Sequence, residues 1–386
     1  MKTRKKSNAS GKRARPRSPA AKLGLGVLGI SEGRSIVSAA LHSELWHVAQ
    51  LCDLNAELGR QRCAEFGIDG ARFTTRYEEL LANPAVDVVG IYTPDHLHAE
   101  HVIAALRAGK HVICTKPFLD GLPRAADVLT AVRRSGKRVF VGQSSRFFAP
   151  FQRQRAHFEE GDFGELVAVE AYYNADHRWF LAKGWAKTDA FKWLYGGLSH
   201  PVDLLRWYVP DIAEVMGYAT LSANGRALGL VHPDTFQFVF KSARGVLARV
   251  SGTYSSPVTP TQRDSNMSCV LRAANGASQA DYYDLRYAWR LTPPGESQGR
   301  SAVETFEDQD DYFFRFGGHS HHAGEYQNYI EYFARCLARG TAPKPDAAEG
   351  IVTVALMLAM EEAAKTGAPV KLADVLARHG LSNLTP

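Results

Sequence analysis

The stretch from residue 23 to residue 34 reads LGLGVLGISEGR and decides the fold of the first part of the chain. It opens with an apolar run over 23–30, passes through Gly29 and Gly33, and leads into a helical pattern that starts near Ser35. A strand, a glycine turn and a helix in this order are typical of a dinucleotide-binding βα unit. Because the two glycines are only four residues apart, the turn alone fits a plain strand-to-helix connection equally well.

Apolar runs continue to alternate with helical patterns after this stretch. Strands are predicted over 46–52, 86–92, 111–114 and 138–141, and helices over 56–66, 96–108 and 124–135. The alternation favours βαβ units with right-handed crossovers and a parallel sheet covered on both faces. Residues 23–145 are therefore predicted to form an α/β Rossmann domain, a doubly wound parallel sheet.

The pattern changes near residue 146. Helices are predicted over 150–160, 202–208, 325–339 and 347–365, and period-two alternation predicts strands over 166–173, 212–221, 235–240, 245–254 and 267–273. The polar and aromatic segment 291–318 is interpreted as a loop. Residues 146–386 are expected to form an α+β domain with a largely antiparallel open sheet, and its C-terminal helices are expected to pack back on the first domain.

Composition and charge narrow the class of protein. The chain of 386 residues is 45% hydrophobic and 22% charged, which excludes a disordered, collagen-like or disulfide-scaffold protein. No apolar run reaches the roughly 18 residues of a spanning helix, so no membrane partner is expected. Residues 1–22 hold nine basic residues and no acidic ones, and we interpret them as a disordered basic tail. Since the rest of the chain holds 37 basic and 40 acidic residues, no specific nucleic-acid partner is expected.

The cysteines indicate a reducing compartment. They are widely spaced and form no CxxC pair, which favours free thiols over a disulfide frame or a zinc site. Residues 1–22 also lack the apolar core of a signal peptide, so a cytoplasmic location is expected. The cysteines are Cys52, Cys63, Cys114, Cys269 and Cys336.

An acidic residue strengthens the case for a dinucleotide. Asp53 ends the second predicted strand, twenty residues after Gly33. A carboxylate at this spacing accepts hydrogen bonds from both ribose hydroxyls and repels a 2′-phosphate, which favours NAD over NADP. The alternative is that Asp53 only caps the following helix.

Two polar motifs follow the next predicted strands. Residues 93–98 read TPDHLH after one strand, and residues 115–117 read TKP after the next. Ligands of such folds bind at the carboxyl ends of the parallel strands, so Lys116 is a candidate site residue. The alternative is a lysine whose side chain extends from a strand end into solvent.

Together these motifs resemble those of the Gfo/Idh/MocA family of NAD(P)-dependent oxidoreductases, which act mostly on sugars and cyclitols. The resemblance covers nearly all of the chain after residue 22 and includes 77–98, 101–117, 141–150, 196–203 and the C-terminal helices. It implies that Lys116 lies beside the nicotinamide and the reacting carbon, and that His200 is the acid/base. It also implies a substrate-binding second domain whose open sheet packs against another subunit, in a homodimer or homotetramer.

The chemistry assigns roles to three residues. Oxidising a secondary alcohol removes a hydride and a proton, and histidine exchanges protons near neutral pH without help, so His200 is the expected base. Asp203, three residues further on, is expected to orient the imidazole, and Lys116 to stabilise negative charge on the substrate oxygen. The alternatives are a structural histidine and an aspartate favoured only by the helix dipole.

The remaining candidates divide into cofactor and substrate residues. Aromatic and polar side chains after residue 171 suit a sugar pocket, although a half-exposed strand end explains them as well. The histidines at 96, 98 and 101, and those of 318–322 beside Glu325, lack metal-ligand spacing, so no metal is expected. The catalytic candidates are Lys116, His200 and Asp203. The cofactor-binding candidates are Gly29, Ser31, Gly33, Arg34, Asp53, Thr93, Pro94, His96, His98, Thr115, Lys116 and Gln143. The substrate-binding candidates are Lys116, Arg146, Tyr172, His177, Arg178, Trp179 and His200, with Lys192 and Trp193 nearby.

Two positions depart from the family pattern. The family's Glu-Lys-Pro reads TKP here, so Thr115 brings a hydroxyl in place of a charge. Gly196 stands where many members carry an aspartate, four residues before the histidine. Two further functions therefore stay open: a redox-neutral enzyme that cleaves a glycoside through transient oxidation, and an NAD-binding protein without catalysis.

Overall fold

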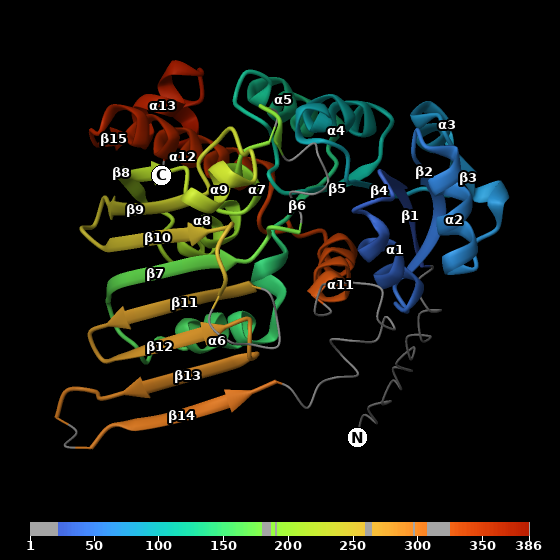
Figure 1. Ribbon diagram of the computed structural model, residues 1–386. Helices are drawn as coiled ribbons and strands as arrows, with labels where there is room; N and C mark the ends of the chain where they lie inside the picture. Colours follow the sequence, from blue (N-terminus) through green and yellow to red (C-terminus); the bar gives the residue numbers. More distant parts are fainter. Residues whose placement is uncertain are drawn as a thin grey trace, which may run out of the picture.

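The structure, a computed structural model, describes residues 22–179, 187–189, 191–258, 265–295, 298–306 and 325–385. Two sheets lie side by side, and helices pack against both of them (Figure 1). The prediction of a disordered basic tail falls on residues 1–21, which lie outside the described residues. Among the helices of the described ranges, none combines the length and the apolar character needed to cross a membrane.

The first sheet has six strands, and all its strand pairs are parallel, in the order β3-β2-β1-β4-β5-β6. This confirms the predicted Rossmann fold; the two-residue strand β3 and helix α3 were not predicted. The strands are β1 Leu23–Leu28, β2 Trp46–Cys52, β3 Phe73–Thr74, β4 Val88–Ile91, β5 His111–Thr115 and β6 Val139–Gly142. The helices are α1 Arg34–Leu41, α2 Ala56–Phe66, α3 Tyr77–Ala82, α4 His98–Arg107 and α5 Ala125–Ser135.

The second sheet has nine strands in the order β14-β13-β12-β11-β7-β10-β9-β8-β15, and only the β7–β10 pair is parallel. This confirms the largely antiparallel sheet. Its strands are β7 Leu166–Ala175, β8 Ile212–Thr220, β9 Thr235–Ser242, β10 Leu247–Thr253, β11 Ser265–Ala273, β12 Gly276–Asp281, β13 Arg286–Leu291, β14 Arg300–Thr305 and β15 Val370–Lys371. The other helices are α6 Ala149–Glu159, α7 Trp193–Gly196, α8 Ser199–Tyr208, α9 Ala223–Ala227, α11 Glu325–Arg339, α12 Ala347–Thr366 and α13 Leu372–Arg378.

The interpretation of 291–318 as a loop is wrong where the structure describes a strand. Arg300–Thr305 forms β14 at the sheet edge, paired antiparallel with β13, and its side chains are almost all exposed. An exposed edge strand needs no apolar alternation, so its sequence carries no period-two signal. Residues 307–318 lie outside the described part of the chain.

The C-terminal helices contact the first domain. The indole Nε1 of Trp46 on β2 donates to the carbonyl oxygen of Ile330 on α11 at 3.0 Å. On α12, a Cβ at Gly350 would lie 2.7 Å from Val141 and 2.9 Å from Phe118, so only a glycine allows this approach. Helix α12 therefore contacts β6 and α5 of the first domain and packs against the β8 end of the second sheet (Figure 1).

Candidate active site

The turn after β1 is shaped by its two glycines. Gly29 has φ +85°, and a Cβ there would lie 2.6 Å from the carbonyl oxygen of Tyr92. The backbone N–H of Gly33 donates to the carbonyl oxygen of Gly29 at 3.1 Å, and a Cβ at Gly33 would lie 2.5 Å from that oxygen. Gly33 is also the N-cap of α1 and provides no side-chain cap. The helix start thus presents backbone N–H groups suited to a pyrophosphate.

Asp53 braces this turn. Its Oδ2 accepts from the backbone N–H of Ile30 at 3.0 Å, and its Oδ1 accepts from that of Asn55 at 2.9 Å. The N-cap of α2 is Asn55, so the alternative that Asp53 caps this helix is wrong. Arg62 of α2 donates from Nε to the carbonyl oxygen of Ile30 at 3.1 Å. Sequence reasoning missed Arg62, because nothing separates it from an ordinary helix-surface arginine.

His98 joins the loops after β4 and β5. It is fully buried, and its Nε2 lies 2.8 Å from the carbonyl oxygen of Thr93 and its Nδ1 2.9 Å from that of Pro117. His101 contacts the hydroxyl of Thr93 at 2.9 Å, whereas His96 is exposed. His98 therefore holds the two strand ends together, and its contact with a cofactor stays a prediction.

Gln143 has an unsatisfied side chain at the end of β6. It is 2% exposed, and its Oε1 has no hydrogen-bond partner among the residues that the structure describes. A buried polar atom without a partner is costly, and a bound amide or hydroxyl would satisfy it. The glycine turn, Asp53 and Gln143 together fit a dinucleotide along the carboxyl edge of the sheet. Along the same edge lie Ser31, Arg34, Pro94 and Thr115.

Lys116 connects the two domains. Its Nζ donates to the carbonyl oxygen of Gly196, the last residue of α7, at 2.6 Å. Burial lowers the pKa of Lys116 from its usual value, while the carboxylates of Asp95 and Glu32 act in the opposite direction. The lysine predicted from the first domain thus meets the segment that carries His200, four residues after Gly196.

The contacts of His200 and Asp203 differ from those expected. Nδ1 of His200 lies 3.1 Å from the hydroxyl oxygen of Ser145, a fully buried residue of the turn after β6. Both carboxylate oxygens of Asp203 accept from Arg146, at 2.6 and 2.8 Å. Ser145 is therefore placed to orient the imidazole. Ser145 and Arg146 are neighbours in sequence, and the residues that they contact, His200 and Asp203, lie about one helical turn apart on α8.

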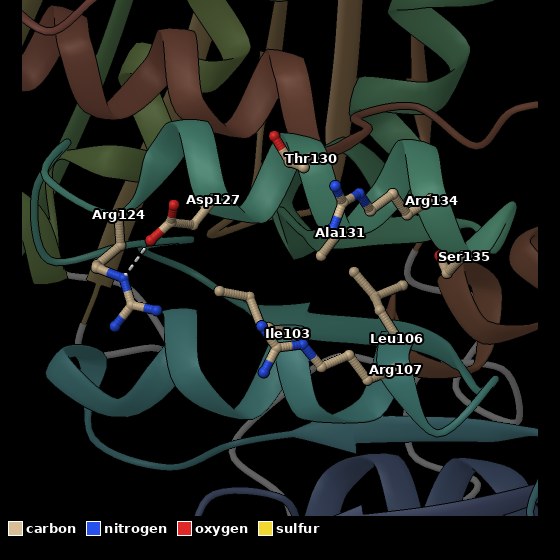
Figure 2. A pocket seen from close by; sticks show the side chains of 9 residues that line it. All are labelled: Ile103, Leu106, Arg107, Arg124, Asp127, Thr130, Ala131, Arg134 and Ser135. Atoms are coloured by element: carbon tan, nitrogen blue, oxygen red, sulfur yellow. Dashed lines mark hydrogen bonds and ion pairs between the residues drawn. The ribbon is translucent and has the colours of Figure 1, made fainter.

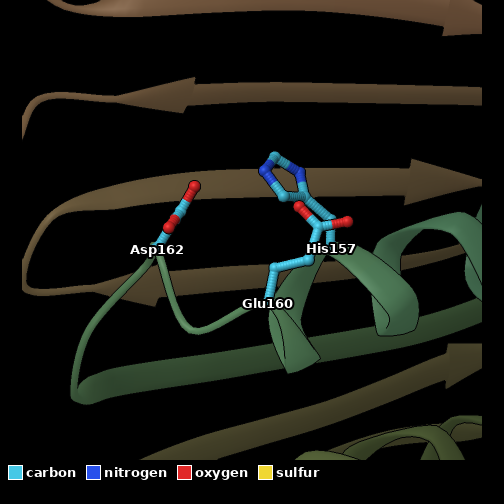
Figure 3. A group of neighbouring side chains, drawn as sticks. All are labelled: His157, Glu160 and Asp162. Atoms are coloured by element: carbon cyan, nitrogen blue, oxygen red, sulfur yellow. The ribbon is translucent and has the colours of Figure 1, made fainter.

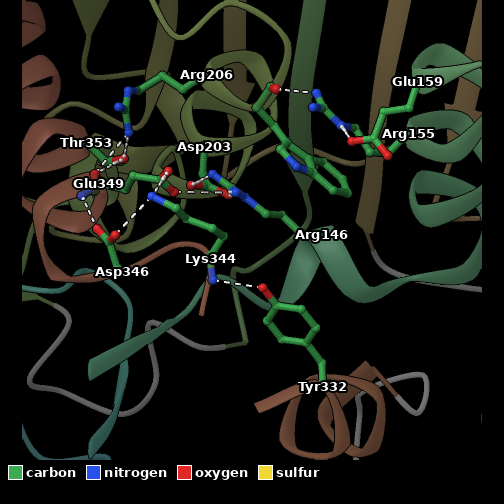
Figure 4. A network of polar contacts seen from close by, with 11 residues as sticks. Arg146, Arg155, Glu159, Asp203, Arg206, Tyr332, Lys344, Asp346, Glu349 and Thr353 are labelled. Atoms are coloured by element: carbon green, nitrogen blue, oxygen red, sulfur yellow. Dashed lines mark hydrogen bonds and ion pairs between the residues drawn. The ribbon is translucent and has the colours of Figure 1, made fainter. Parts of the chain in front are cut away.

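Arg146 and Asp203 form a buried ion pair at the domain junction. Their side chains are 6% and 0% exposed, and Nη1 of Arg146 lies 3.8 Å from Glu349 of α12 (Figure 4). Arg206 of α8 donates from Nη1 to the backbone of Glu349 at 2.9 Å and to the hydroxyl of Thr353 at 2.7 Å. This geometry gives the pair a structural role at the domain junction, and the substrate-binding role of Arg146 and the catalytic role of Asp203 stay predictions.

Aromatic rings fill the space beside the glycines before His200. A Cβ at Gly196 would lie 2.9 Å from the ring of Phe191, and one at Gly197 would lie 2.4 Å from the ring of Tyr254. Trp193 stacks on Tyr254 with ring centroids 4.6 Å apart and an angle of 6°. Gly196, which stands where many family members carry an aspartate, therefore lies against aromatic rings.

The alternation of side chains between the two faces of β7 changes one of the substrate-binding candidates. The ring of Tyr173 lies 5.7 Å from that of His200, whereas Tyr172 is paired with Ser268 in the sheet and points to the opposite face. Tyr173, which the sequence reasoning passed over, thus replaces Tyr172 as the tyrosine candidate beside His200. Counting alternate residues from the buried Ala171 would have found it.

The other substrate candidates are divided between the site and its surroundings. His177 stacks on Trp193 at 5.2 Å. Arg178 forms a two-point contact with Asp176, and Trp179 is 52% exposed. Lys192 contacts Glu361 of α12. His177 and Trp193 therefore remain as candidates beside His200, while Lys192 is engaged elsewhere.

A surface hollow between α4 and α5 carries none of the expected site residues (Figure 2). Its arginines have ordinary explanations. Arg107 and Arg134 lie in the last turns of their helices, where the helix dipole favours a cation, and Arg124 pairs with Asp127 at 2.8 Å.

One cluster has potential metal donors. His157, Glu160 and Asp162 lie together at the C-terminal end of α6 (Figure 3). Nδ1 of His157 lies 2.7 Å from the hydroxyl of Tyr287, and Glu160 lies 3.6 Å from the guanidinium of Arg153. A neighbouring cation and two exposed acids make this a weak metal site. The histidines of 318–322 lie outside the described residues.

The chain is similar to known proteins over both domains. Levoglucosan dehydrogenase from Pseudarthrobacter phenanthrenivorans is 26% identical over 269 residues, which are 66% of this chain and 65% of that protein. Inositol 2-dehydrogenase 1 from Saccharopolyspora erythraea is 26% identical over 366 residues, 93% of this chain and 98% of that protein. A solved structure of levoglucosan dehydrogenase in complex with NADH and levoglucosan has the same fold, with a TM-score of 0.78 at 20% identity, over 91% of this chain and 99% of that chain.

Two family profiles match the chain directly. The profile described as "Oxidoreductase family, NAD-binding Rossmann fold" matches residues 23–143. The profile described as "GFO/IDH/MocA C-terminal domain" matches residues 151–278. Since the two matches cover more than half of its length, the chain belongs to the Gfo/Idh/MocA family of oxidoreductases.

Proposed function

We propose that the protein is an NAD-dependent oxidoreductase that transfers a hydride between nicotinamide and a secondary alcohol or ketone of a sugar, a sugar derivative or a cyclitol. The observation that carries this proposal is the 2.6 Å contact between Lys116 Nζ and the carbonyl oxygen of Gly196. It brings the lysine at the end of β5 to the segment that holds His200. The names of the relatives support the substrate class.

The residues divide the work of alcohol oxidation. A bound NAD supplies the hydride acceptor. Lys116 donates a hydrogen bond to the substrate oxygen and stabilises the negative charge that develops there. His200 takes the hydroxyl proton on Nε2, because its Nδ1 faces Ser145. In the direction of reduction, the same nitrogen returns the proton.

The choice of NAD over NADP is supported by Asp53. Its carboxylate lies at the turn of residues 29–33, held by the N–H of Ile30. A ribose 2′-hydroxyl is a hydrogen-bond donor to such a group, and a 2′-phosphate is repelled by it.

We also propose that the protein forms a dimer or tetramer through the outer face of the second sheet and works in the cytoplasm. Tyr218, Val239 and Leu247 on this face are 69%, 47% and 53% exposed, and a partner subunit would cover these apolar side chains. The described cysteines are free and buried, which suits a reducing compartment. Light scattering coupled to gel filtration tests the oligomer; a monomer at micromolar concentration contradicts it.

The function is tested by mass spectrometry of sugars, sugar acids, cyclitols and aryl glycosides after incubation with the protein and NAD. The Lys116→Ala variant serves as the blank. A product lighter by two hydrogens, with an equal amount of NADH, supports the dehydrogenase and names its substrate. A cleaved glycoside without net NADH replaces it with the redox-neutral enzyme. Tight NAD binding without any turnover of the panel favours a binding protein.

A further inference from the structure

We propose that Glu361 of α12 is a positioning residue for Lys116, acting through the short helix α7. The changes in kcat and KM that we expect rest on the proposed function. The expected shift in the titration midpoint of Lys116 does not. The contacts join Glu361 to α7 and α7 to Lys116, so each step can be followed from named atoms.

Helix α7 depends on outside contacts for its position. It spans only Trp193–Gly196, and a helix of this length has no stability of its own. Glu361 accepts from the Nζ of Lys192, the residue just before α7, at 2.8 Å. It also accepts from the hydroxyl of Tyr195 within α7 at 2.8 Å. One carboxylate therefore holds the short helix at two points.

The opposite side of α7 is held by stacking. Trp193 lies between Lys192 and Tyr195 in sequence and packs flat on Tyr254. A carboxylate on one side and an aromatic ring on the other leave α7 little freedom to rotate. Rotation would move the carbonyl oxygen of Gly196, the acceptor of Lys116 Nζ.

Helix α12, which carries Glu361, also holds α8. Arg206 of α8 donates to Glu349 and Thr353 of α12. Glu349 and Glu361 are separated by twelve residues of one continuous helix, about 18 Å at 1.5 Å per residue. Helix α12 thus fixes α7, with the acceptor of Lys116, relative to α8, with His200.

The carboxylate of Glu361 is ionised at neutral pH. Burial raises the pKa of Glu361, but hydrogen bonds from Lys192, Lys365 and Tyr195 outweigh this and lower it to about 2. Around Lys116 the charged neighbours are Asp95 and Glu32. The carboxylate therefore stays ionised and keeps its contacts with α7 over the whole range in which Lys116 titrates.

The test compares two neighbouring glutamates of α12. Glu361→Ala removes the contacts with α7, whereas Glu362→Ala, the matched control, removes an exposed ion pair with Arg378. The protein is labelled with [6-¹³C]lysine, and the Lys116 signal, identified by its loss in Lys116→Arg, is followed against pH. We expect Glu361→Ala to shift the midpoint by about half a pH unit or more, because Nζ loses its fixed acceptor. We expect Glu362→Ala to leave the midpoint unchanged.

Two milder variants guard against misfolding. Glu361→Gln retains one acceptor oxygen and should lie closer to the wild type than Glu361→Ala, and Tyr195→Phe removes a single hydrogen bond. With a substrate from the panel, Glu361→Ala should lower kcat about tenfold and leave the KM for NAD within twofold, since small misplacements of catalytic groups cost up to ~10²-fold. An unshifted Lys116 signal in Glu361→Ala and Tyr195→Phe, or an equal shift in Glu362→Ala, overturns the proposal even if no substrate is found.

Discussion

The two halves of the site are assembled in different ways. Thr93, Lys116 and Gln143 lie within two residues of the ends of β4, β5 and β6, so the parallel sheet itself brings them to one edge. Gly196 and His200 lie on α7 and α8, and these helices are held in place by side chains from distant parts of the chain. Backbone topology thus builds the cofactor half, and side-chain pairs build the substrate half. Substitutions in the two halves should therefore have different effects on turnover, cofactor binding and stability.

The largest effect on turnover is expected for Lys116, where the cofactor half and the substrate half of the site meet. Lys116→Ala should lower kcat by at least ~10³-fold and leave the Kd for NAD within a few-fold, because it removes charge stabilisation and keeps the strand that presents the cofactor site. Steady-state kinetics and calorimetric NAD binding measure the two quantities. Lys371→Ala, at an exposed lysine of β15, is the control. Turnover within tenfold of the wild type would sink the assignment.

The buried ion pair of the substrate half should dominate stability. Arg146→Met leaves Asp203 buried and unpaired, so we expect it to lower the free energy of unfolding by about 3–5 kcal/mol. Arg244→Met breaks a similar two-point pair with Asp211 on the surface and should cost about 0–1 kcal/mol. Urea unfolding of both variants measures the contrast. Equal losses would show that the junction does not depend on this pair.

Acid should weaken the substrate half through Glu361. Since its folded pKa of about 2 lies below the ordinary 4.5, its contribution of at most about 3 kcal/mol is present above pH ~4.5 and is lost as pH falls towards 2. The difference in unfolding free energy between the wild type and Glu361→Gln should therefore shrink over this range. Urea unfolding at several pH values measures it, and a constant difference contradicts the assignment.

A smaller effect is expected from the group beside His200. Ser145→Ala removes the hydroxyl that contacts Nδ1 and should lower kcat about tenfold without changing the KM for NAD, because the imidazole loses its preferred orientation. Ser144→Ala, at the adjacent buried serine, is the matched control. A loss of activity shared by both variants would point to general disturbance of the turn.

An effect of similar size is expected in the cofactor half, at Asp53. Asp53→Ala should weaken NAD binding about tenfold and NADP binding less, since a hydrogen bond to a charged group contributes about 1.5–3 kcal/mol and the variant also removes a repulsion. Fluorescence titration with NADH and NADPH measures both. If the two weaken equally, the carboxylate only braces the turn at Ile30.

The same difference explains how far the sequence could predict the molecule. Apolar runs and their order specify β1, β2 and β4 to β6, and the motifs that follow them mark Lys116, because strand ends in a parallel sheet gather by topology alone. The pairing of Asp203 with Arg146 is a choice between two possible partners for a carboxylate, and only the packed structure decides it.

Other differences arise where the sequence signal is short or absent. Tyr172 and Tyr173 are both tyrosines, so only strand register shows which one faces His200. Edge strand β14 has no apolar period, and its pairing with β13 defines it. Ser145 and Glu361 act over 55 and 166 residues of sequence separation, which local patterns cannot report.

The acceptor of Lys116 is a main-chain atom, and this has a consequence for how the site changes under mutation. A carbonyl oxygen neither gains nor loses a proton, so acidity acts on this contact only through Lys116 itself. No substitution deletes it either, and only a change in the path of the backbone displaces it. In a saturation scan, Gly196 and Gly197 should therefore reject other residues because of the rings of Phe191 and Tyr254, and should do so for all side chains regardless of charge.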